Sequence, residues 1–378
     1  MSTPEVQGKL NQLRERIDKL DSQLVELLAE RKRVVDEVAQ LKHLHHLNTL
    51  HPAREENLIS SRRQQASQAG LDPDYVEDLF RSVMRQSRVG QLDTVARRAV
   101  RPGGKVLIVG GLGSMGQFFT RWFQQSQYEV RILDIDDWPR ATDLASQVDL
   151  CLIAVPIDKS PTVARQIGPH LPKTCILADI TSLKAGPLAA MLEGHGGPVV
   201  GLHPLFGPAT TTMDKQIVVV TPGRRLDECR WLFDQLVLWG NVLVETSAEE
   251  HDTTMGIVQS LRHFATFAFG QFLHSRGVTI SRTLELSSPI YRLELAMVGR
   301  LFAQDPKLYA EIVFATPERI QLLKDYIKSL AENLSLVERG DKEEFISRFN
   351  DISKWFGPFS EQALRESSFL VEKLVHRF

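Results

Sequence analysis

The sequence contains little cysteine, no large excess of charge of either sign and no long apolar run. Its three cysteines, Cys151, Cys175 and Cys229, are too few and too odd in number for a disulfide framework, so we expect reduced core residues. The formal net charge of −2 gives no positive field, which argues against binding to nucleic acid or to an acidic membrane. No signal-peptide core and no segment apolar enough to cross a bilayer is present. We therefore expect a cytoplasmic protein whose ligands are small molecules.

The length and the hydrophobic pattern indicate a multidomain α and α/β protein. A chain of 378 residues is long enough for two or three domains. Apolar residues at helical spacing occupy residues 1–92, residues 93–104 have the composition of a linker, and short apolar runs alternate with helical patterns over residues 105–246. This alternation predicts a parallel sheet with helices on both faces, a Rossmann-type domain. Helical patterns return over residues 247–378, so the expected order is helical, α/β, helical.

In the N-terminal domain, the apolar seam of a long predicted helix is interrupted by one charged residue. The seam comprises Leu13, Ile17, Leu20, Leu24, Leu27, Val34, Val38 and Leu41. Arg31 occupies a seam position, where an anion must meet its charge if it is buried. Lys42, about three turns further on, points in nearly the same direction, and Glu55, Ser87 and Gln91 lie on inward faces of the next predicted helices. These residues predict a polar pocket for a small dianion; surface salt bridges on a dimeric coiled coil are the alternative.

A glycine-rich turn directly follows the first predicted strand of the α/β domain. Its GxGxxG spacing is formed by Gly111, Gly113 and Gly116. In this motif the first glycine makes a tight turn, the second lets the backbone approach a pyrophosphate, and the third lets the helix pack closely. An ordinary glycine-rich turn is the alternative. However, Asp134 ends the next predicted strand, where a carboxylate accepts hydrogen bonds from the adenosine ribose and repels a 2′-phosphate.

The acid at position 134 favours NAD over NADP as the cofactor, although Arg131 and Arg140 nearby oppose this preference. Residues around the turn and at the end of the apolar run from Leu150 complete the predicted site. The predicted cofactor-binding residues are Gly111, Gly113, Ser114, Met115, Gly116, Asp134, Val155 and Pro156.

Three further residues could bind or activate a substrate. His203 lies at the carboxyl end of a predicted strand, beside the crevice where ligands of such sheets bind, and a histidine there can act as a base. A structural histidine in a loop is the alternative. Arg292 and Arg300 lie in a largely apolar predicted helix, and either could anchor a carboxylate. For Arg292, an ion pair with Glu294 or another acid is the alternative.

A group of histidines follows the long N-terminal helix. They are His43, His45, His46 and His51. Imidazoles are common zinc ligands, but no cysteine or carboxylate pattern accompanies them. A solvated loop explains the group, and we predict no metal site.

The N-terminal domain carries a series of motifs in a recognisable order. They are Leu13-Arg14, Ala29-Glu30-Arg31, Lys42, Arg54-Glu55, Ser87 and Gln91. Over nearly all of positions 5–92 the sequence resembles the all-α chorismate mutases. The resemblance implies a dimer with shared long helices, in which Arg14 reaches the partner's site, the arginines bind the two carboxylates, Lys42 and Gln91 hold the ether oxygen, and Glu55 takes the ring hydroxyl. Such a site suits a Claisen rearrangement, which needs a folded substrate and charge stabilisation but no nucleophile. His51 departs from the acidic residue of some relatives.

Four stretches in the remaining domains resemble prephenate dehydrogenase. They are residues 179–184, 201–208, 259–267 and 287–300. Together with the N-terminal match, they make essentially the whole chain similar to the bifunctional chorismate mutase/prephenate dehydrogenases of enteric-type bacteria. The resemblance implies that His203 accepts a hydrogen bond from the substrate hydroxyl and that Arg300 binds a prephenate carboxylate. The predicted substrate-binding residues are Arg300, Gln259, His263, Ser182, Lys184 and Arg292.

The resemblance implies two consecutive reactions on one chain. Chorismate is rearranged to prephenate, which NAD then oxidises to 4-hydroxyphenylpyruvate with loss of carbon dioxide. The resemblance also implies a homodimer, a C-terminal substrate-binding and dimerisation domain, and feedback inhibition by tyrosine. Two other interpretations remain: a dehydrogenase whose N-terminal helices only dimerise, and a non-catalytic NAD-sensing regulator. A dimerisation module would not need the inward polar residues, and a sensor would not need His203 and Arg300.

Overall fold

The computed structural model describes residues 4–44, 52–95 and 98–375, which form two compact units. The N-terminal unit combines Met1–Val155 with Lys159–Ala248, and the C-terminal unit combines Pro156–Asp158 with Glu249–Phe378. The first of these compact units contains both the N-terminal helices and the α/β segment. None of the helices in the described ranges has both the length and the apolar character to span a membrane.

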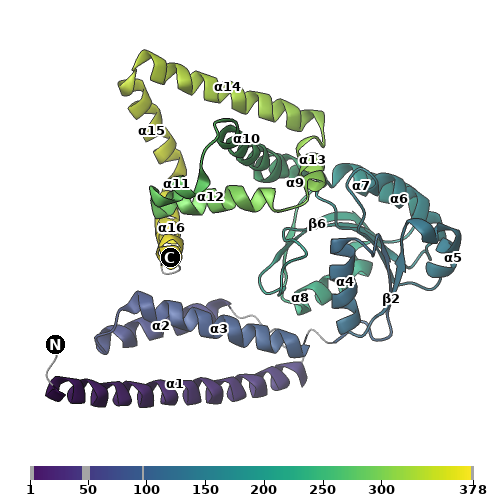
Figure 1. Cartoon of the computed structure of the whole chain (residues 1–378). Helices are drawn as coiled ribbons and strands as arrows, with labels where there is room; N and C mark the ends of the chain where they lie inside the picture. The colour runs from purple at the N-terminus through teal and green to yellow at the C-terminus, as the bar shows by residue number, and fades with distance from the viewer. Residues whose placement is uncertain (1–3, 45–51, 96–97, 376–378) are drawn as a thin grey trace. The chain divides into compact units, whose positions relative to one another are not determined.

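Three helices open the chain: α1 (Pro4–Leu44), α2 (Pro52–Gln68) and α3 (Pro73–Val95) (Figure 1). Prolines are tolerated at such helix starts because a first-turn N–H has no acceptor within the helix. Gly70, with φ 72°, follows α2 in the left-handed conformation that commonly ends a helix. The predicted helices are therefore confirmed. Residues 93–95, which we predicted to belong to a linker over 93–104, are the last residues of α3.

The apolar seam of α1 is exposed over most of its length. The exposed seam residues are Leu13, Ile17, Leu20, Leu24, Leu27, Val34, Val38 and Leu41. The buried apolar residues of the three helices are Ala39, Ile59, Ala66, Val76 and Met84. Helix α3 packs against both α1 and α2. A helix with so long an apolar face gains stability by burying it against a further partner.

The α/β domain contains a seven-stranded sheet in the order β2-β1-β3-β4-β5-β6-β7. Its strands are β1 (Lys105–Val109), β2 (Glu129–Leu133), β3 (Leu150–Ile153), β4 (Ile176–Asp179), β5 (Val199–Pro204), β6 (Ile217–Arg224) and β7 (Val242–Glu245). Pairs among β1–β5 are parallel, as predicted. The prediction is wrong for β6, which pairs antiparallel to β5, and β7 was not predicted. The apolar pattern of a short buried strand is the same whether the strand pairs parallel or antiparallel, so the sequence could not predict the direction of β6.

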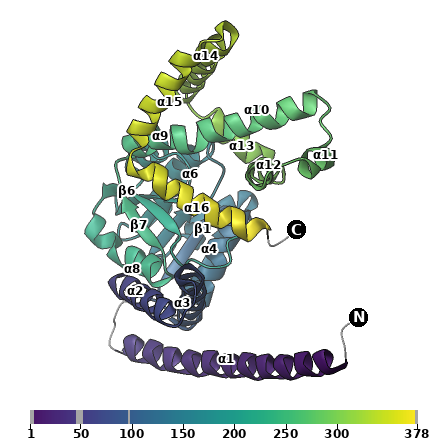
Figure 2. The same cartoon turned by 90° about the vertical axis from the view of Figure 1, so that its left-hand side faces the viewer.

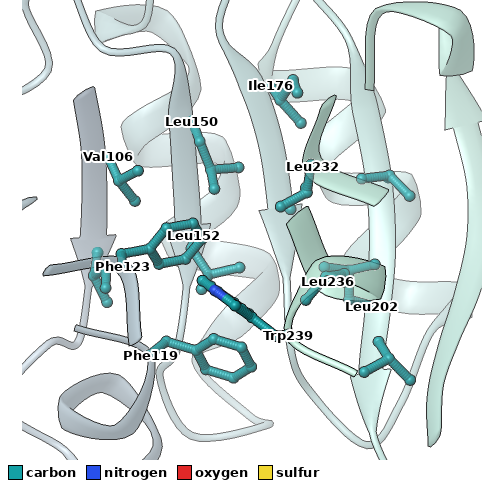
Figure 3. Packing of buried hydrophobic residues seen from close by; sticks show 14 of the residues in the cluster. Val106, Phe119, Phe123, Leu150, Leu152, Ile176, Leu202, Leu232, Leu236 and Trp239 are labelled. Atoms are coloured by element: carbon teal, nitrogen blue, oxygen red, sulfur yellow. The ribbon is translucent and has the colours of Figure 1, made fainter. Parts of the chain in front are cut away.

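Helices cover both faces of this sheet. They are α4 (Ser114–Gln125), α5 (Ala141–Leu144), α6 (Ser160–Ile167), α7 (Ala185–Gly194) and α8 (Arg230–Leu238), with short 3₁₀ segments at Ile135–Arg140, Gly168–His170 and Leu226–Cys229. Alternate residues of β1 point to opposite faces. Val106 and Ile108 join a core with aromatic residues of α4 and with Trp239, shown in Figure 3, whereas Leu107 and Val109 join a second core.

The three cysteines belong to these two cores. Cys151 and Cys175 lie in one and Cys229 in the other, and all three are free and buried. Burial raises the pKa of each thiol, that of Cys229 to about 12. The expectation of unpaired core cysteines is confirmed.

The C-terminal unit is helical. Its elements are α9 (Ala248–Met255), the π-helical segment η4 (Gly256–Leu261), α10 (Arg262–Ser275), α11 (Ile280–Glu285), α12 (Pro289–Phe302), α13 (Pro306–Val313), α14 (Pro317–Arg339), α15 (Lys342–Phe356) and α16 (Pro358–Val375). Several of these helices begin at a side-chain cap, such as Ser288 before α12 and Thr316 before α14. In Figure 2, α10, α12 and α13 gather together and α14 leads into α15.

Candidate active sites

The glycine-rich turn lies at the carboxyl end of β1, which has β2 on one side and β3 on the other. This is the point of an open sheet at which chain order reverses and ligands bind. The tight turn is made by Gly110, with φ 80°, and not by Gly111 as predicted. Gly111 is required for another reason, because a Cβ there would lie 2.7 Å from Ile132 Cγ2. At Gly113 a Cβ would lie 3.4 Å from the Gly110 carbonyl oxygen, an ordinary van der Waals contact, so this position is less crowded than Gly111. A glycine at this place in the motif lets a pyrophosphate approach the backbone closely.

Helix α4 begins directly after Gly113, whose position has no side chain to cap the helix. The amides of the first turn, which include those of Ser114 and Met115, have no acceptor within the helix. Such amides and the helix dipole attract an anion. Gly116 is packed against Gly110, because a Cβ at Gly116 would collide with the Gly110 carbonyl. This turn and this helix therefore have the backbone geometry that the motif requires, and the binding of a phosphate here stays a prediction.

Asp134 lies at the end of β2 and is joined to the glycine-rich turn. Its carboxylate accepts a hydrogen bond from the Leu112 N–H at 3.1 Å and another from the Ile135 N–H at 2.9 Å. Of the two nearby cations, Arg131 is held by Glu129 at 2.7 Å and by the Ser146 carbonyl at 2.8 Å.

The last two predicted cofactor-binding residues, Val155 and Pro156, belong to different compact units. Arg140, the second nearby cation, is largely exposed and lies 3.9 Å from Asp137. Val155 lies next to the glycine-rich turn, because a Cβ at Gly110 would come within 2.8 Å of Val155 Cγ1. Pro156 belongs to the C-terminal unit.

His203 is a buried residue of β5, and a buried ion pair supports the strand beside it. The Lys184 ammonium donates to Asp179 Oδ2 at 2.5 Å and to the carbonyl of Leu202, the residue before His203, at 2.6 Å. The side chains of Lys184 and Asp179 are both 0% exposed. Thr181 also donates to Asp179, through its N–H at 3.1 Å and through its hydroxyl. A pair so fully desolvated costs free energy unless its geometry is good, and here it joins the ends of β4 and β5.

Through these contacts, Lys184 stabilises β5, the strand that carries His203. Ser182, in the same loop, is half-buried. The importance of Asp179 was missed from the sequence, although it lies within residues 179–184, one of the stretches that resemble prephenate dehydrogenase. Its signal was a carboxylate at the end of an otherwise apolar strand, where a cation must meet it.

In the C-terminal unit, Gln259 and His263 lie on and directly after a π-helical segment. Gln259 is half-buried in η4, and His263 is buried in the first turn of α10 with its ring edge-on to Tyr309, centroids 4.7 Å apart. The Ile312 carbonyl accepts hydrogen bonds from Ser260 and from Arg319, both at 2.9 Å. Single π-helical turns are frequent at functional sites, and this one is fixed to α13 and α14.

Stability should depend on pH through His263. Burial, with a smaller effect of Arg262, lowers the pKa of His263 from 6.5 to about 4. Because the folded pKa is below the unfolded one, the neutral ring contributes stability that is fully present above pH 6.5 and is lost as pH falls toward 4. We expect urea unfolding to show a loss of about 2 kcal/mol between pH 7 and pH 5 that His263→Gln removes. An unchanged pH dependence in that variant would contradict this assignment.

The two arginines of α12 differ. Arg292 is half-buried and donates to the Leu284 carbonyl at 2.5 Å, a contact that we did not predict. Arg300 lies in the last turn of α12 and is exposed, which leaves it accessible to a carboxylate. Both belong to the C-terminal unit, as do Gln259 and His263.

The structure brings together part of the predicted pocket in the N-terminal helices. Arg31 of α1 is half-buried, and its guanidinium donates to Ser87 Oγ of α3 at 2.6 Å. Glu55 of α2 is paired with Arg88 of α3 at 2.7 Å, a partner that was missed from the sequence. Arg14 and Arg54 are exposed.

Other candidates lie partly or wholly outside the described residues. Lys42 belongs to α1 and Gln91 to α3, but their side chains are outside the described part. The same holds for the His43 side chain and for the histidines at 45, 46 and 51. Among the residues that are described, no group of His, Cys, Asp or Glu could hold a metal ion.

Comparison with known proteins connects both sites to one family. Family models match three segments: chorismate mutase type II at residues 13–92, the prephenate dehydrogenase nucleotide-binding domain at 124–243, and the prephenate dehydrogenase dimerization domain at 247–351. The chain is 44% identical to the T-protein of Enterobacter agglomerans over 364 residues, which cover 96% of this chain and 97% of that one. The chain belongs to the T-protein family. The T-protein of Haemophilus influenzae is 40% identical over the same shares of both chains.

The T-protein match confirms the bifunctional interpretation and the predicted fold. The N-terminal helices are a chorismate mutase domain, and the sheet and the C-terminal helices are the nucleotide-binding and dimerization domains of a prephenate dehydrogenase. A crystal structure of prephenate dehydrogenase from A. aeolicus, in complex with hydroxyphenyl propionate and NAD+, has the same fold with a TM-score of 0.53. It is 19% identical and covers 67% of this chain and 97% of that one.

Proposed function

We propose that the residues identified above perform the two consecutive steps of tyrosine biosynthesis that this chain catalyses. The chain rearranges chorismate to prephenate and oxidises prephenate to 4-hydroxyphenylpyruvate and carbon dioxide. The observation that carries the proposal is that one polypeptide holds both an inward arginine paired with Ser87 and a buried histidine at the carboxyl end of a dinucleotide-binding sheet.

In the dehydrogenase, the proposed role of His203 is to accept the proton of the ring hydroxyl as its carbon is oxidised. Bound NAD supplies the hydride acceptor. Arg300 binds a prephenate carboxylate and so orients the ring. The carbon–carbon bond to the ring carboxylate breaks, and its electron pair enters the ring and shifts the carbonyl π electrons onto oxygen. That oxygen takes the proton back from His203 to form the phenol, and aromatisation drives the release of carbon dioxide. Asp179 and Lys184 hold the backbone beside His203, which fixes the base relative to the sheet.

In the mutase, the proposed site binds a folded conformer of chorismate. Arg31, Arg54 and the partner's Arg14 bind the two carboxylates. Lys42 and Gln91 donate to the ether oxygen, where negative charge develops as its carbon–oxygen bond breaks. Ser87 keeps Arg31 in place through the 2.6 Å hydrogen bond, and Glu55 binds the ring hydroxyl.

The cofactor in this proposal is NAD rather than NADP. Asp134 places a carboxylate at the ribose position, and the guanidinium of Arg131 is engaged by Glu129 and by backbone carbonyls. A 2′-phosphate would therefore meet a negative charge that no free guanidinium of Arg131 offsets.

The proposed assembly is a homodimer, with tyrosine as a feedback inhibitor and the cytoplasm as the location. The exposed seam of α1 and the exposed apolar residues of α14–α16, such as Ile327 and Trp355, are the surfaces that a second copy would cover. Sedimentation of the intact protein as a monomer would contradict the dimer. Prephenate oxidation that does not change when tyrosine is added would contradict the inhibition, and fractionation of the cell tests the location.

The dehydrogenase proposal is tested with prephenate and each dinucleotide. We expect NADH, 4-hydroxyphenylpyruvate and carbon dioxide in equal amounts, and kcat/KM about tenfold or more lower with NADP, because the 2′-phosphate meets Asp134. Equal use of NADP would contradict the role of Asp134. The absence of carbon dioxide would contradict the reaction itself.

A further inference from the structure

A network of four charges joins the mutase helices to a turn of the nucleotide-binding domain. Arg88 of α3 donates to Glu55 at 2.7 Å and, on its other edge, to both oxygens of Asp214 at 3.1 and 3.2 Å. Lys215 approaches the second oxygen of Glu55 at 3.4 Å. The side chains of Arg88 and Asp214 are only 14% and 9% exposed, so their interaction is little screened by water. Two positive and two negative charges balance each other, with Glu55 held by both cations.

The turn that carries Asp214 and Lys215 is fixed by the core of the sheet domain. Lys215 has φ 58°, a left-handed conformation that is strained for a residue with a side chain. It is held there because its N–H donates to the Gly240 carbonyl at 2.9 Å. The Asp214 N–H donates to Thr212 Oγ1 at 3.1 Å, and Met213 is fully buried in the core. The backbone that carries both charges is thus held by hydrogen bonds and by a buried neighbouring side chain.

The chain connects this turn to the dehydrogenase base. The segment between β5 and β6 begins directly after His203 and Pro204, and Asp214 and Lys215 lie near its end. The connection between β5 and β6 therefore follows His203, the proposed base of the dehydrogenase. Near its other end it carries the charged residues that interact with Arg88 and Glu55 of the mutase helices.

We propose that Arg88, Asp214 and Lys215 are positioning residues for Glu55, so that the nucleotide-binding domain completes the chorismate mutase site. The proposal rests on the proposed role of Glu55 in binding the ring hydroxyl. Arg88 and Lys215 fix the direction of the Glu55 carboxylate, and Asp214 keeps Arg88 in place. Without them the carboxylate adopts several rotamers, and productive binding of chorismate becomes less frequent.

The experiment measures mutase kcat and KM, and dehydrogenase kcat, in the full chain. We expect Asp214→Asn to lower mutase kcat/KM about tenfold and Lys215→Met about two- to fivefold, because Lys215 is half exposed. Most of the change should be in KM, because Glu55 acts in substrate binding. Lys215→Arg, which keeps the positive charge, should retain the mutase activity of the native protein. Prephenate oxidation should stay unchanged in these variants, which shows that they are folded.

Two comparisons separate the possible failures. Lys173→Met removes an exposed lysine of the same domain and should leave the mutase unchanged. Glu55→Gln should lower mutase kcat/KM on the order of 10²-fold. If Glu55→Gln has no effect, the proposed role of Glu55 fails. Suppose that Glu55→Gln lowers mutase activity as expected. If Asp214→Asn and Lys215→Met then leave the mutase unchanged, or lower mutase and dehydrogenase activity equally, the positioning network is refuted and the proposed function stands.

Discussion

His203→Asn is expected to lower the rate of prephenate oxidation about 10²- to 10⁴-fold, because asparagine fills the same space but cannot accept a proton. His203 is buried in β5, with the Lys184–Asp179 pair bound to the carbonyl of the preceding residue, so its place depends on the strand. The variant should therefore fold and keep its site otherwise intact. Steady-state formation of NADH from prephenate measures the effect.

Chorismate rearrangement in the His203→Asn variant should proceed at the normal rate, which provides an internal control. His170→Asn, at an exposed histidine of the same domain, is a matched control and should affect neither reaction. If His203→Asn oxidised prephenate normally, another group would have to accept the hydroxyl proton. Loss of both activities would point to a folding defect.

Arg31→Ala is expected to lower mutase kcat/KM on the order of 10²-fold and to leave prephenate oxidation unchanged. The guanidinium is half-buried and held by Ser87 at 2.6 Å, so it is oriented before a substrate carboxylate binds. A charge-assisted hydrogen bond of this kind contributes more than a neutral one. The initial rate of chorismate disappearance, followed at several concentrations, measures the effect.

Arg33→Ala is the matched control for this experiment, because Arg33 lies on the same helix but is exposed. It should leave the mutase rate unchanged. Equal mutase rates in Arg31→Ala and the native protein would mean that Arg31 is an ordinary salt-bridge residue, which is the interpretation that the seam pattern alone left open.

The sequence predicted the elements whose signals are local. The long seam of α1 and the glycine-rich turn after β1 each depend on neighbouring residues and on simple steric rules. The edge strand β7 was missed because it has only four residues and is mostly exposed, so the run around Val242 and Val244 lacks a clear apolar pattern.

What the sequence did not reveal depends on contacts between distant segments. The pairing of Arg88 with Asp214 joins residues 126 positions apart, and no local pattern connects them. Likewise, the close contacts that a Cβ at Gly110 would make with Ala154, and one at Gly111 with Ile132, involve segments distant in the sequence. The hydrogen bond from Arg292 to the Leu284 carbonyl could not be foreseen either, since a backbone acceptor has no signature in the sequence.

The most direct test of the account supplies the purified full chain with chorismate alone, identifies the product, and then adds NAD to the same sample. With both activities on one chain, we expect prephenate to accumulate first and NADH and 4-hydroxyphenylpyruvate then to form in equal amounts. If chorismate remained unchanged while added prephenate gave NADH, the mutase half of the account would be contradicted. If neither substrate reacted, the central claim of two activities on one chain would be wrong.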